Sequence, residues 1–220
     1  MESISPNIIR SGPHHTNMRG EALRQYLAMQ GRIMIPEFEL AAEQIAARFD
    51  EGNVLVIGTS GINLAPILED KSDGLIVHCM DANPETVALA RECGPHLRYT
   101  QWTEHRVPFR ERSFVCVVSL WELHHWTDPA AVLAMSSEVL VKGGIVTFFD
   151  LYRDCPPEGL EKFTSANEQL RERMRAHLVT TLEKDAILTL FNECDRFARV
   201  EAHDKGNFLQ VTGTVSTDPR

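Results

Sequence analysis

The chain has 220 residues, of which 43% are hydrophobic, and its formal net charge at pH 7 is −9. A chain of this length can bury one substantial core, so we expect one globular unit. The negative charge argues against a protein that binds nucleic acid by neutralising phosphates, and no stretch approaches the roughly 20 consecutive apolar residues of a membrane helix. We therefore expect a cytoplasmic protein that binds neither nucleic acid nor a membrane.

Residues 1–52 predict an arm followed by a helical cap. The first part of this segment is polar and is interrupted by prolines and glycines, which is typical of an arm without regular structure. Apolar residues at helical spacing then predict one helix over residues 21–30 and a second that begins at Pro36 and reaches Phe49. We expect these helices to form a lid over a substrate pocket.

Residues 53–220 predict an α/β domain with a Rossmann-like, doubly wound sheet that is mostly parallel. Short apolar runs alternate here with amphipathic segments, which is typical of parallel strands joined by crossover helices. Strands are predicted over residues 54–57, 75–80, 97–99, 114–119 and 144–149. Helices are predicted over residues 65–69, 84–93, 129–140, 158–175 and 183–194, the third ending at the lysine and two glycines of 142–144. Strands over 198–203 and 207–215 predict a C-terminal antiparallel hairpin.

Ligands of such sheets bind beyond the carboxyl ends of the strands, where the strand order reverses. The first strand runs into Gly58, Thr59, Ser60 and Gly61, which are small residues that let the backbone and a helix start approach a ligand closely. Ordinary packing of a strand against the next helix explains such a turn equally well.

Asp81 follows the second strand, roughly twenty residues after the glycine turn, where nucleoside-binding proteins place an acid that accepts hydrogen bonds from ribose hydroxyls. A carboxylate at a strand end suits a diol because both bonds are charge-assisted. The alternative is structural, since Asp81 or Asn83 could cap the helix that begins at Pro84. The spacing from the glycine turn favours ribose binding.

Three motifs follow in order: Val-Pro-Phe-Arg-Glu-Arg-Ser-Phe over residues 107–114, Leu-His-His-Trp-Thr-Asp-Pro over 123–129, and Val-Leu-Val-Lys-Gly-Gly over 139–144. With these motifs the chain resembles the small-molecule class I methyltransferases that depend on S-adenosylmethionine (SAM), of the methyltransferase type 11-like branch. The resemblance implies that SAM lies over the ends of the first, second and fourth strands and leaves as S-adenosylhomocysteine (SAH).

The resemblance also implies a role for each candidate residue. Gly58, Thr59, Ser60 and Gly61 would contact the methionine part of SAM, Asp81 and Ala82 the ribose, Trp102 and Thr103 the adenine, and Leu120 and Trp121 the methyl-donor side. Glu122, His124 or His125 would reach the substrate, with Glu122 and His124 as the catalytic candidates. The alternative is structural, since in this family the paired histidines often cap the fourth strand. His124 is the first candidate for a general base, because a histidine near its ordinary pKa titrates at working pH.

The sequence departs from the family at the turn and at the adenine. Val56 stands where the first strand usually carries an acid, Ser60 and Ile62 stand at glycine positions, and Thr103 stands where an aspartate is common. Either SAM binds through a rearranged loop, or the fold serves a non-methylating reaction or a binding or partner subunit. An NAD-dependent oxidoreductase is disfavoured because the turn lacks the G-x-G-x-x-G pattern.

We expect no metal site, because the adjacent pairs His14-His15 and His124-His125 point their side chains in different directions. The five cysteines contain no C-x-x-C pair and predict reduced thiols, with Cys155 in a loop where it could be accessible. We expect no appended recognition domain, which favours a small-molecule substrate. The exposed edge of the C-terminal hairpin could support a homodimer.

Overall fold

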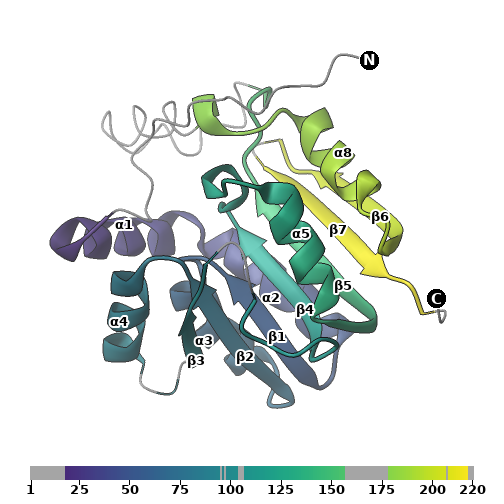
Figure 1. The fold of residues 1–220 in the computed structure, drawn as a ribbon. Coiled ribbons are helices and arrows are strands. Elements are labelled where there is room, and N and C mark those ends of the chain that lie inside the picture. The colour runs from purple at the N-terminus through teal and green to yellow at the C-terminus, as the bar shows by residue number, and fades with distance from the viewer. Residues whose placement is uncertain are drawn as a thin grey trace.

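The computed structural model describes residues 18–94, 96, 98–103, 107–156, 178–206 and 208–217, and it contains a seven-stranded sheet in the order β3-β2-β1-β4-β5-β7-β6 (Figure 1). The strands are β1 (Gly52–Ile57), β2 (Leu75–Asp81), β3 (Arg98–Gln101), β4 (Phe114–Leu120), β5 (Leu140–Asp150), β6 (Phe197–Asp204) and β7 (Leu209–Val215). The helices are α1 (Gly20–Ile33), α2 (Ile35–Arg48), α3 (Gly61–Lys71), α4 (Pro84–Cys93), α5 (Pro129–Glu138) and α8 (Lys184–Glu193), and η2 (Leu123–His125) is a 3-10 turn.

The first five strands run parallel, and β7 is antiparallel to both β5 and β6. This arrangement confirms the predicted doubly wound, mostly parallel sheet with a C-terminal antiparallel hairpin. The strand order reverses between β1 and β4, because the chain builds outward from β1 to β3 on one side and continues from β4 on the other. The switch point where ligands of such sheets bind is therefore the carboxyl edge of β1 and β4.

Helices cover both faces of the sheet. Val54 and Val56 of β1 pack into one apolar cluster with α2 and α3, and Leu55 and Ile57 pack into a second cluster with α5 and α8. Figure 1 shows α5 and α8 on the viewer's side of the sheet and α2 and α3 behind it. Alternate residues of β1 are buried on opposite faces, which explains why a central parallel strand has an unbroken apolar sequence.

Helix α1 lies at the edge where the parallel strands end. Leu23, Tyr26 and Leu27 pack against Leu89 of α4, and the side chain of Asn63 in α3 donates a hydrogen bond of 3.4 Å to the Leu27 carbonyl oxygen. These contacts hold α1 across the starts of α3 and α4 (Figure 1). The described part of the predicted lid thus adjoins the loops that follow β1 and β2.

The prediction that residues 142–144 end a helix is wrong. Helix α5 ends at Glu138, and β5 already begins at Leu140, so the two glycines lie inside a strand. Gly143 has a φ of +75°, and the register between β4 and β5 shifts between Phe114 and Cys116, which identifies a β-bulge. A bulge and a helix stop both select glycine for positive φ, so the sequence signal was the same.

Three other predictions concern Cys155, the helix over residues 158–175 and the N-terminal arm. Cys155 is buried rather than accessible, with 9% of its surface exposed, and burial raises the pKa of its thiol. The predicted helix over residues 158–175 and most of the N-terminal arm lie outside the described residues. None of the helices described is long and apolar enough to span a membrane.

Candidate functional site

The loop after β1 begins with a residue that only glycine suits. Gly58 has a φ of +98°, and its amide donates a hydrogen bond of 2.8 Å to the carbonyl oxygen of Met80 in β2. A side chain at this φ would strain the backbone. The bond to β2 fixes the point at which the chain leaves the sheet and turns toward α3.

The rest of this loop needs no positive φ. Ser60 has a φ of −57° and precedes α3, while Gly61 and Ile62 are the first residues of that helix. A β-carbon on Gly61 would collide with the Tyr99 hydroxyl and the Cys79 thiol, so glycine is required there for close packing. Ile62 therefore has an ordinary helical backbone, and Gly61 supplies no unusual flexibility in its place.

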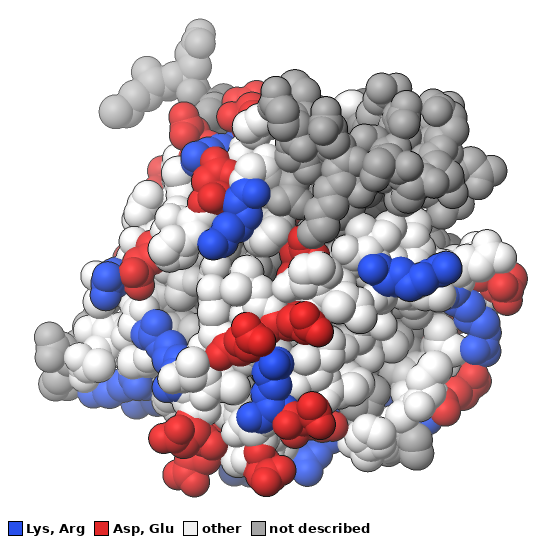
Figure 2. All heavy atoms as spheres, turned by 180° about the vertical axis from the view of Figure 1, so that it is seen from behind, with Lys and Arg blue, Asp and Glu red and all other residues white. Residues whose placement is uncertain are grey.

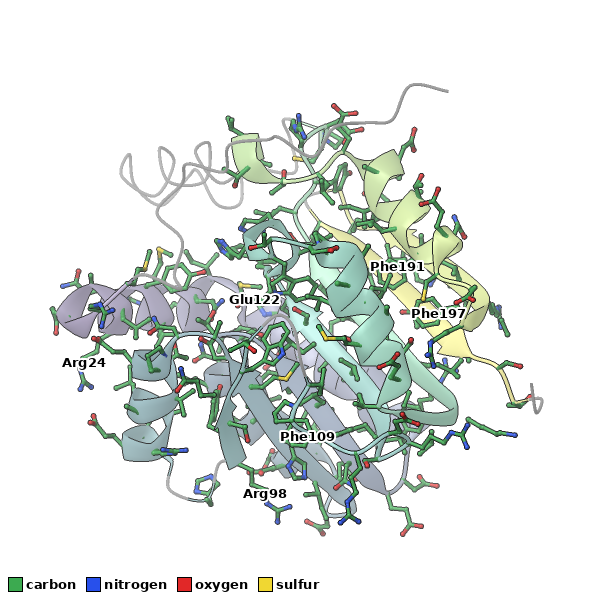
Figure 3. All side chains as sticks on the ribbon, in the orientation of Figure 1. Arg24, Arg98, Phe109, Glu122, Phe191 and Phe197 are labelled. Atoms are coloured by element: carbon green, nitrogen blue, oxygen red, sulfur yellow. The ribbon has the colours of Figure 1, made fainter. Side chains whose placement is uncertain are left out.

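Glu122 fills the space beside the glycine loop. The chain turns sharply after β4 because Trp121 has a φ of +59°, and Glu122 then points back to the loop. Its Oε1 accepts hydrogen bonds of 2.8 Å from both the amide and the hydroxyl of Thr59. A β-carbon on Gly58 would collide with the Glu122 side chain. Figure 3 shows Glu122 near the centre of the molecule, where the parallel strands end.

Helix α1 adds two buried polar side chains to the same loop. Gln30 is 1% exposed, and its side-chain amide donates a hydrogen bond of 3.4 Å to the Thr59 hydroxyl. The Tyr26 hydroxyl also lies within hydrogen-bonding reach of Thr59, and burial raises the pKa of Tyr26 above its usual value. Thr59 is therefore enclosed from two sides, by α1 and by Glu122.

Asp81 ends β2 and is 1% exposed. Its Oδ1 accepts a hydrogen bond of 2.7 Å from the Asn83 amide, and the Asn83 side chain in turn caps α4 by accepting from the Glu85 amide at 3.0 Å. Asn83 is therefore the residue that caps α4, and the alternative in which Asp81 is the cap is wrong. Within the described part of the chain, the buried Oδ2 of Asp81 has no hydrogen-bond partner.

Burial changes the protonation of both carboxyl groups. Desolvation raises the pKa of Asp81 to about 7, although the hydrogen bond from the Asn83 amide and the nearby Thr86 hydroxyl oppose this shift. Desolvation also raises the pKa of Glu122 well above its usual value, and the negative charges of Asp81 and Asp150 raise it further, against the bonds from Thr59. The edge of the sheet therefore gathers acidic side chains in a place that water reaches poorly, and their charged forms are disfavoured there.

A histidine and an aspartate pair on the β5 side of the site. The Nδ1 of His124 lies 3.1 Å from the Oδ1 of Asp150, and the Oδ2 of Asp150 accepts a hydrogen bond of 2.7 Å from the Leu123 amide. His124 is 2% exposed, and its ring centroid lies 3.9 Å from that of His125. Asp150 therefore fixes both the turn η2 and the orientation of the His124 ring.

The remaining candidates lie around this centre. Trp102 follows β3, its amide donates to the Asp81 carbonyl oxygen at 3.0 Å, and it is 4% exposed. Thr103 is exposed and lines a cavity of about 550 Å³ that Trp102 also borders. Ala82 is half-buried beside Asp81, whereas Leu120 and Trp121 are buried in the apolar cluster under α2 and α3.

Three buried polar atoms on successive loops have no partner among the residues described: Ser60 Oγ after β1, Asp81 Oδ2 after β2 and Trp102 Nε1 after β3. Buried polar groups are nearly always hydrogen-bonded, and each unsatisfied one costs about 1 to 3 kcal/mol. All three loops leave the same edge of the sheet. The arrangement suits an elongated ligand that carries hydrogen-bond donors and acceptors along its length.

The sequence reasoning missed Gln30 and Asp150. Asp150 was predictable, because it follows a buried apolar strand just as Asp81 does. Gln30 gave no signal, since its role depends on where α1 docks. Among the described residues, no group of three or more His, Cys, Asp or Glu side chains has the geometry to hold a metal ion.

Comparison with known families and structures gives a consistent result. Residues 55–148 match the model of the family described as "Methyltransferase domain". No curated protein sequence matches the chain significantly. The matched segment runs from β1 to β5 and includes Gly58, Asp81, Glu122 and His124.

Solved structures share the fold at low sequence identity. A proposed SAM-dependent methyltransferase from Methanococcus maripaludis is 15% identical with a TM-score of 0.67, covering 93% of this chain and 97% of its own. An O-methyltransferase family protein from Burkholderia thailandensis is 12% identical with a TM-score of 0.68, covering 90% and 61%. A protein from Thermotoga maritima, proposed as a histamine N-methyltransferase, is 15% identical with a TM-score of 0.63, covering 87% and 93%.

Proposed function

We propose that the chain is a class I, SAM-dependent methyltransferase that transfers the methyl group of SAM to a small molecule, because residues 55–148 match the methyltransferase-domain model and the fold is shared with solved methyltransferases. Bound SAM supplies an electrophilic methyl group on a sulfonium centre and leaves as SAH. The protein's part in such a reaction is to hold the accepting atom in line with that methyl group and, where necessary, to remove a proton.

The observation that carries this proposal is the row of buried, unpartnered polar atoms at the carboxyl edge. The Oδ2 of Asp81 would accept from a ribose hydroxyl, beside Ala82, and the indole N–H of Trp102 would donate to the adenine side, next to Thr103. Gly58, Thr59, Ser60 and Gly61 would hold the methionine part, and Leu120 and Trp121 would border the methyl-donor side. The residues present therefore fit an adenosine-containing ligand.

His124 is the residue that we assign as general base. Asp150 would hold Nδ1 in the donor form, so that the lone pair lies on Nε2, which would take the proton of the accepting atom. General bases typically contribute about 10² to 10⁴ in rate. His124→Gln should therefore lower kcat by about a hundredfold or more while leaving the dissociation constant of SAH unchanged, as measured by calorimetry. A variant that loses SAH binding instead would assign His124 to the cofactor site.

A small substrate is supported by the enclosure of the site and by the surface charge. Tyr26 and Gln30 of α1 cover the glycine loop, so the space near it is closed to a large substrate. Figure 2 shows Lys and Arg side chains interspersed with Asp and Glu on the face seen from behind, without a continuous basic area among the described residues there. Such a surface does not suit a nucleic-acid substrate.

A second candidate function keeps the fold without methyl transfer, as a non-methylating enzyme or a binding or partner subunit. The position of Glu122 favours it, because the carboxyl group takes space beside Gly58 that a loop of this kind offers to a ligand. Under this function SAM would bind weakly or would bind without reacting.

Calorimetric titration with SAM and SAH distinguishes the two functions. Binding of both at sub-millimolar concentration, followed by transfer of label from methyl-labelled SAM to a member of a metabolite panel, is the expected result. Binding without transfer to any acceptor would favour the second function. If neither compound bound, the methyl-transfer proposal would be lost.

A further inference from the structure

We propose that the outer edge of β6, the edge that does not face β7, pairs with the same edge of a second copy of the chain. The two strands would run antiparallel about a two-fold axis at Val200, so that Arg199 of each copy faces Glu201 of the other. Such pairing is independent of the proposed function. It gives a partner and a register to an edge where the sequence only allows a homodimer.

Strand β6 ends the sheet beyond β7, and no other described strand pairs with its outer edge (Figure 1). From Arg199 to Asp204 each residue is matched one to one with β7, so this part of the strand is regular. Ala198, Arg199, Ala202 and His203 are exposed. A regular, exposed edge presents backbone N–H and C=O groups that can pair with another strand.

The side chains of β6 leave this edge accessible. Phe197, the largest of them, stacks on Phe191 of α8 with a centroid distance of 5.8 Å, and Val200 packs on the same face of the sheet (Figure 3). Arg199 and Glu201 alternate with Val200 and so lie on the opposite face. There Arg199 donates a hydrogen bond of 2.9 Å to Glu201, and the two side chains are 70% and 34% exposed. Both charges can therefore reach a strand laid alongside.

The order of residues in β6 is self-complementary about Val200. In an antiparallel pair of identical strands, residues at equal distances on the two sides of the two-fold axis lie opposite each other on the same face. With the axis at Val200, Arg199 faces Glu201 of the second copy, and Glu201 faces Arg199 of the second copy. Ala198 and Ala202, which are small, face each other beside these pairs.

Other registers lack this match. An axis at Arg199 or Glu201 places like charges directly opposite each other, and an axis at Ala198 or Ala202 gives no pair of arginine with glutamate. Opposite charges across two strands stabilise the pair, whereas like charges destabilise it. The chain has a net charge of −9, but Arg199 and Glu201 leave residues 197–203 with no excess of either sign among Lys, Arg, Asp and Glu. Charge thus favours this edge and one register of it.

The contact between the copies would be small. The pairing of β6 with β7 is irregular between Phe197 and Arg199, where Ala198 is the extra residue, and this keeps the regular ladder between the copies short. Small interfaces form weak and transient complexes. We therefore expect a dimer with a dissociation constant on the order of 100 μM.

Sedimentation equilibrium of the full chain over a series of concentrations tests the pairing. Wild type should dimerise, whereas Arg199→Glu and Glu201→Arg should each weaken dimerisation by about tenfold or more, because each places like charges opposite each other twice. An equimolar mixture of these two variants should form a dimer again, since every acidic side chain then faces a basic one. The matched controls are Arg24→Glu and Glu92→Arg, which make the same charge changes in an ion pair between α1 and α4 and should leave dimerisation unchanged.

The double variant Arg199→Glu/Glu201→Arg exchanges the charges within one chain, so it should dimerise like wild type, and melting curves establish that each variant is folded. A wild-type chain that stays monomeric up to about 1 mM would overturn the inference. A dimer that both single variants retain would also overturn it, because the contact would then lie elsewhere. A mixture of the single variants that remains monomeric would exclude the register at Val200.

Discussion

Two buried carboxyl groups lie at the same edge of the sheet, and they differ in what they touch. Asp81 uses one oxygen for the Asn83 amide and keeps the other without a partner among the described residues. Glu122 gives one oxygen to two donors of Thr59 and lies against a glycine. Asp81 thus keeps one oxygen unpartnered among these residues, whereas the Glu122 carboxyl group packs against the loop after β1.

This difference locates the specificity of the site. A carboxylate with an unused oxygen can accept from any diol, so Asp81 recognises what adenosine ligands share. A carboxyl group that is held in place and surrounded by other acids responds mainly to charge. Under the proposed function, Asp81 would bind the adenosine part that SAM and SAH have in common.

The largest expected effect on stability and binding comes from the contact between Gly58 and Glu122. Gly58→Ala adds a side chain at a φ of +98° and into the space of Glu122, so the loop must rearrange. We expect the free energy of unfolding to fall by about 2 to 3 kcal/mol, and SAH to bind about a hundredfold more weakly because binding must restore the loop. Chemical denaturation and calorimetry measure the two effects.

The double variant Gly58→Ala/Glu122→Ala sharpens this test. If the collision is the cause, shortening Glu122 should restore part of the stability, with a coupling free energy of about 1 kcal/mol or more. Strictly additive effects would mean that backbone strain at residue 58 accounts for the whole loss and that Glu122 does not share its space.

Asp81→Ala tests the proposed contact between Asp81 and the ribose. The variant should fold, because Asn83 rather than Asp81 caps α4 and a buried charge is removed. SAM and SAH should bind at least about tenfold more weakly, which corresponds to about 1.4 kcal/mol. Asp73→Ala is the control, since Asp73 is exposed near the opposite end of β2. Unchanged affinity in Asp81→Ala would place the ribose elsewhere.

The position of Asp81 in the fold was easier to predict from the sequence than that of Glu122, for a physical reason. Asp81 is placed by a local rule, since a residue that follows a buried parallel strand lies at the ligand edge. The position of Glu122 depends on the turn at Trp121, where a bulky residue adopts positive φ against its own preference. Such a conformation is imposed by the surrounding structure and leaves no mark in the local sequence.

In the fold, too, features set by the local sequence were predictable, and features that depend on distant contacts were not. The central strands β1, β2, β4 and β5 were predictable because burial produces apolar runs, and the strand boundaries agree with the structure to within a few residues. The two glycines at 143 and 144 were misread because a bulge and a helix stop require the same backbone freedom. The docking of α1 through Gln30 was not predictable, since it depends on surfaces that meet only in the folded chain.

The pH dependence of ligand binding should show whether the charged form of Asp81 takes part in it. With a pKa of about 7, Asp81 is mostly charged at pH 8 and mostly protonated at pH 6. If its charged form accepts from the ribose, the affinity for 5′-methylthioadenosine, which lacks the amino-acid tail, should fall by about tenfold between these values. Asp81→Asn should remove most of this dependence. An unchanged slope in that variant would assign the titration to another group.

The stability of the unliganded protein should respond in the opposite direction. The pKa of Asp81 is raised on folding, so its protonated form stabilises the folded state below about pH 4, and this contribution is lost as the pH rises through about 7. Asp81→Asn should therefore gain in free energy of unfolding relative to the wild type as the pH increases from 5 to 8. Denaturation at these two pH values measures the gain, which should be absent from Asp73→Ala.

Ile62→Gly carries the smallest expected effect on binding and places glycine where the resemblance leads one to expect it. Ile62 lies in the first turn of α3 with ordinary φ, and it packs against the clusters shared by α1 and the sheet. The change should lower the free energy of unfolding by about 1 to 2 kcal/mol through lost packing and helix propensity, while SAH affinity changes by less than about twofold. A marked gain in affinity would instead mean that the loop after β1, and not Glu122, limits how the methionine part is held. Ile62→Ala is the control, because it removes the same packing without adding backbone freedom, so a gain limited to glycine would identify flexibility as the cause.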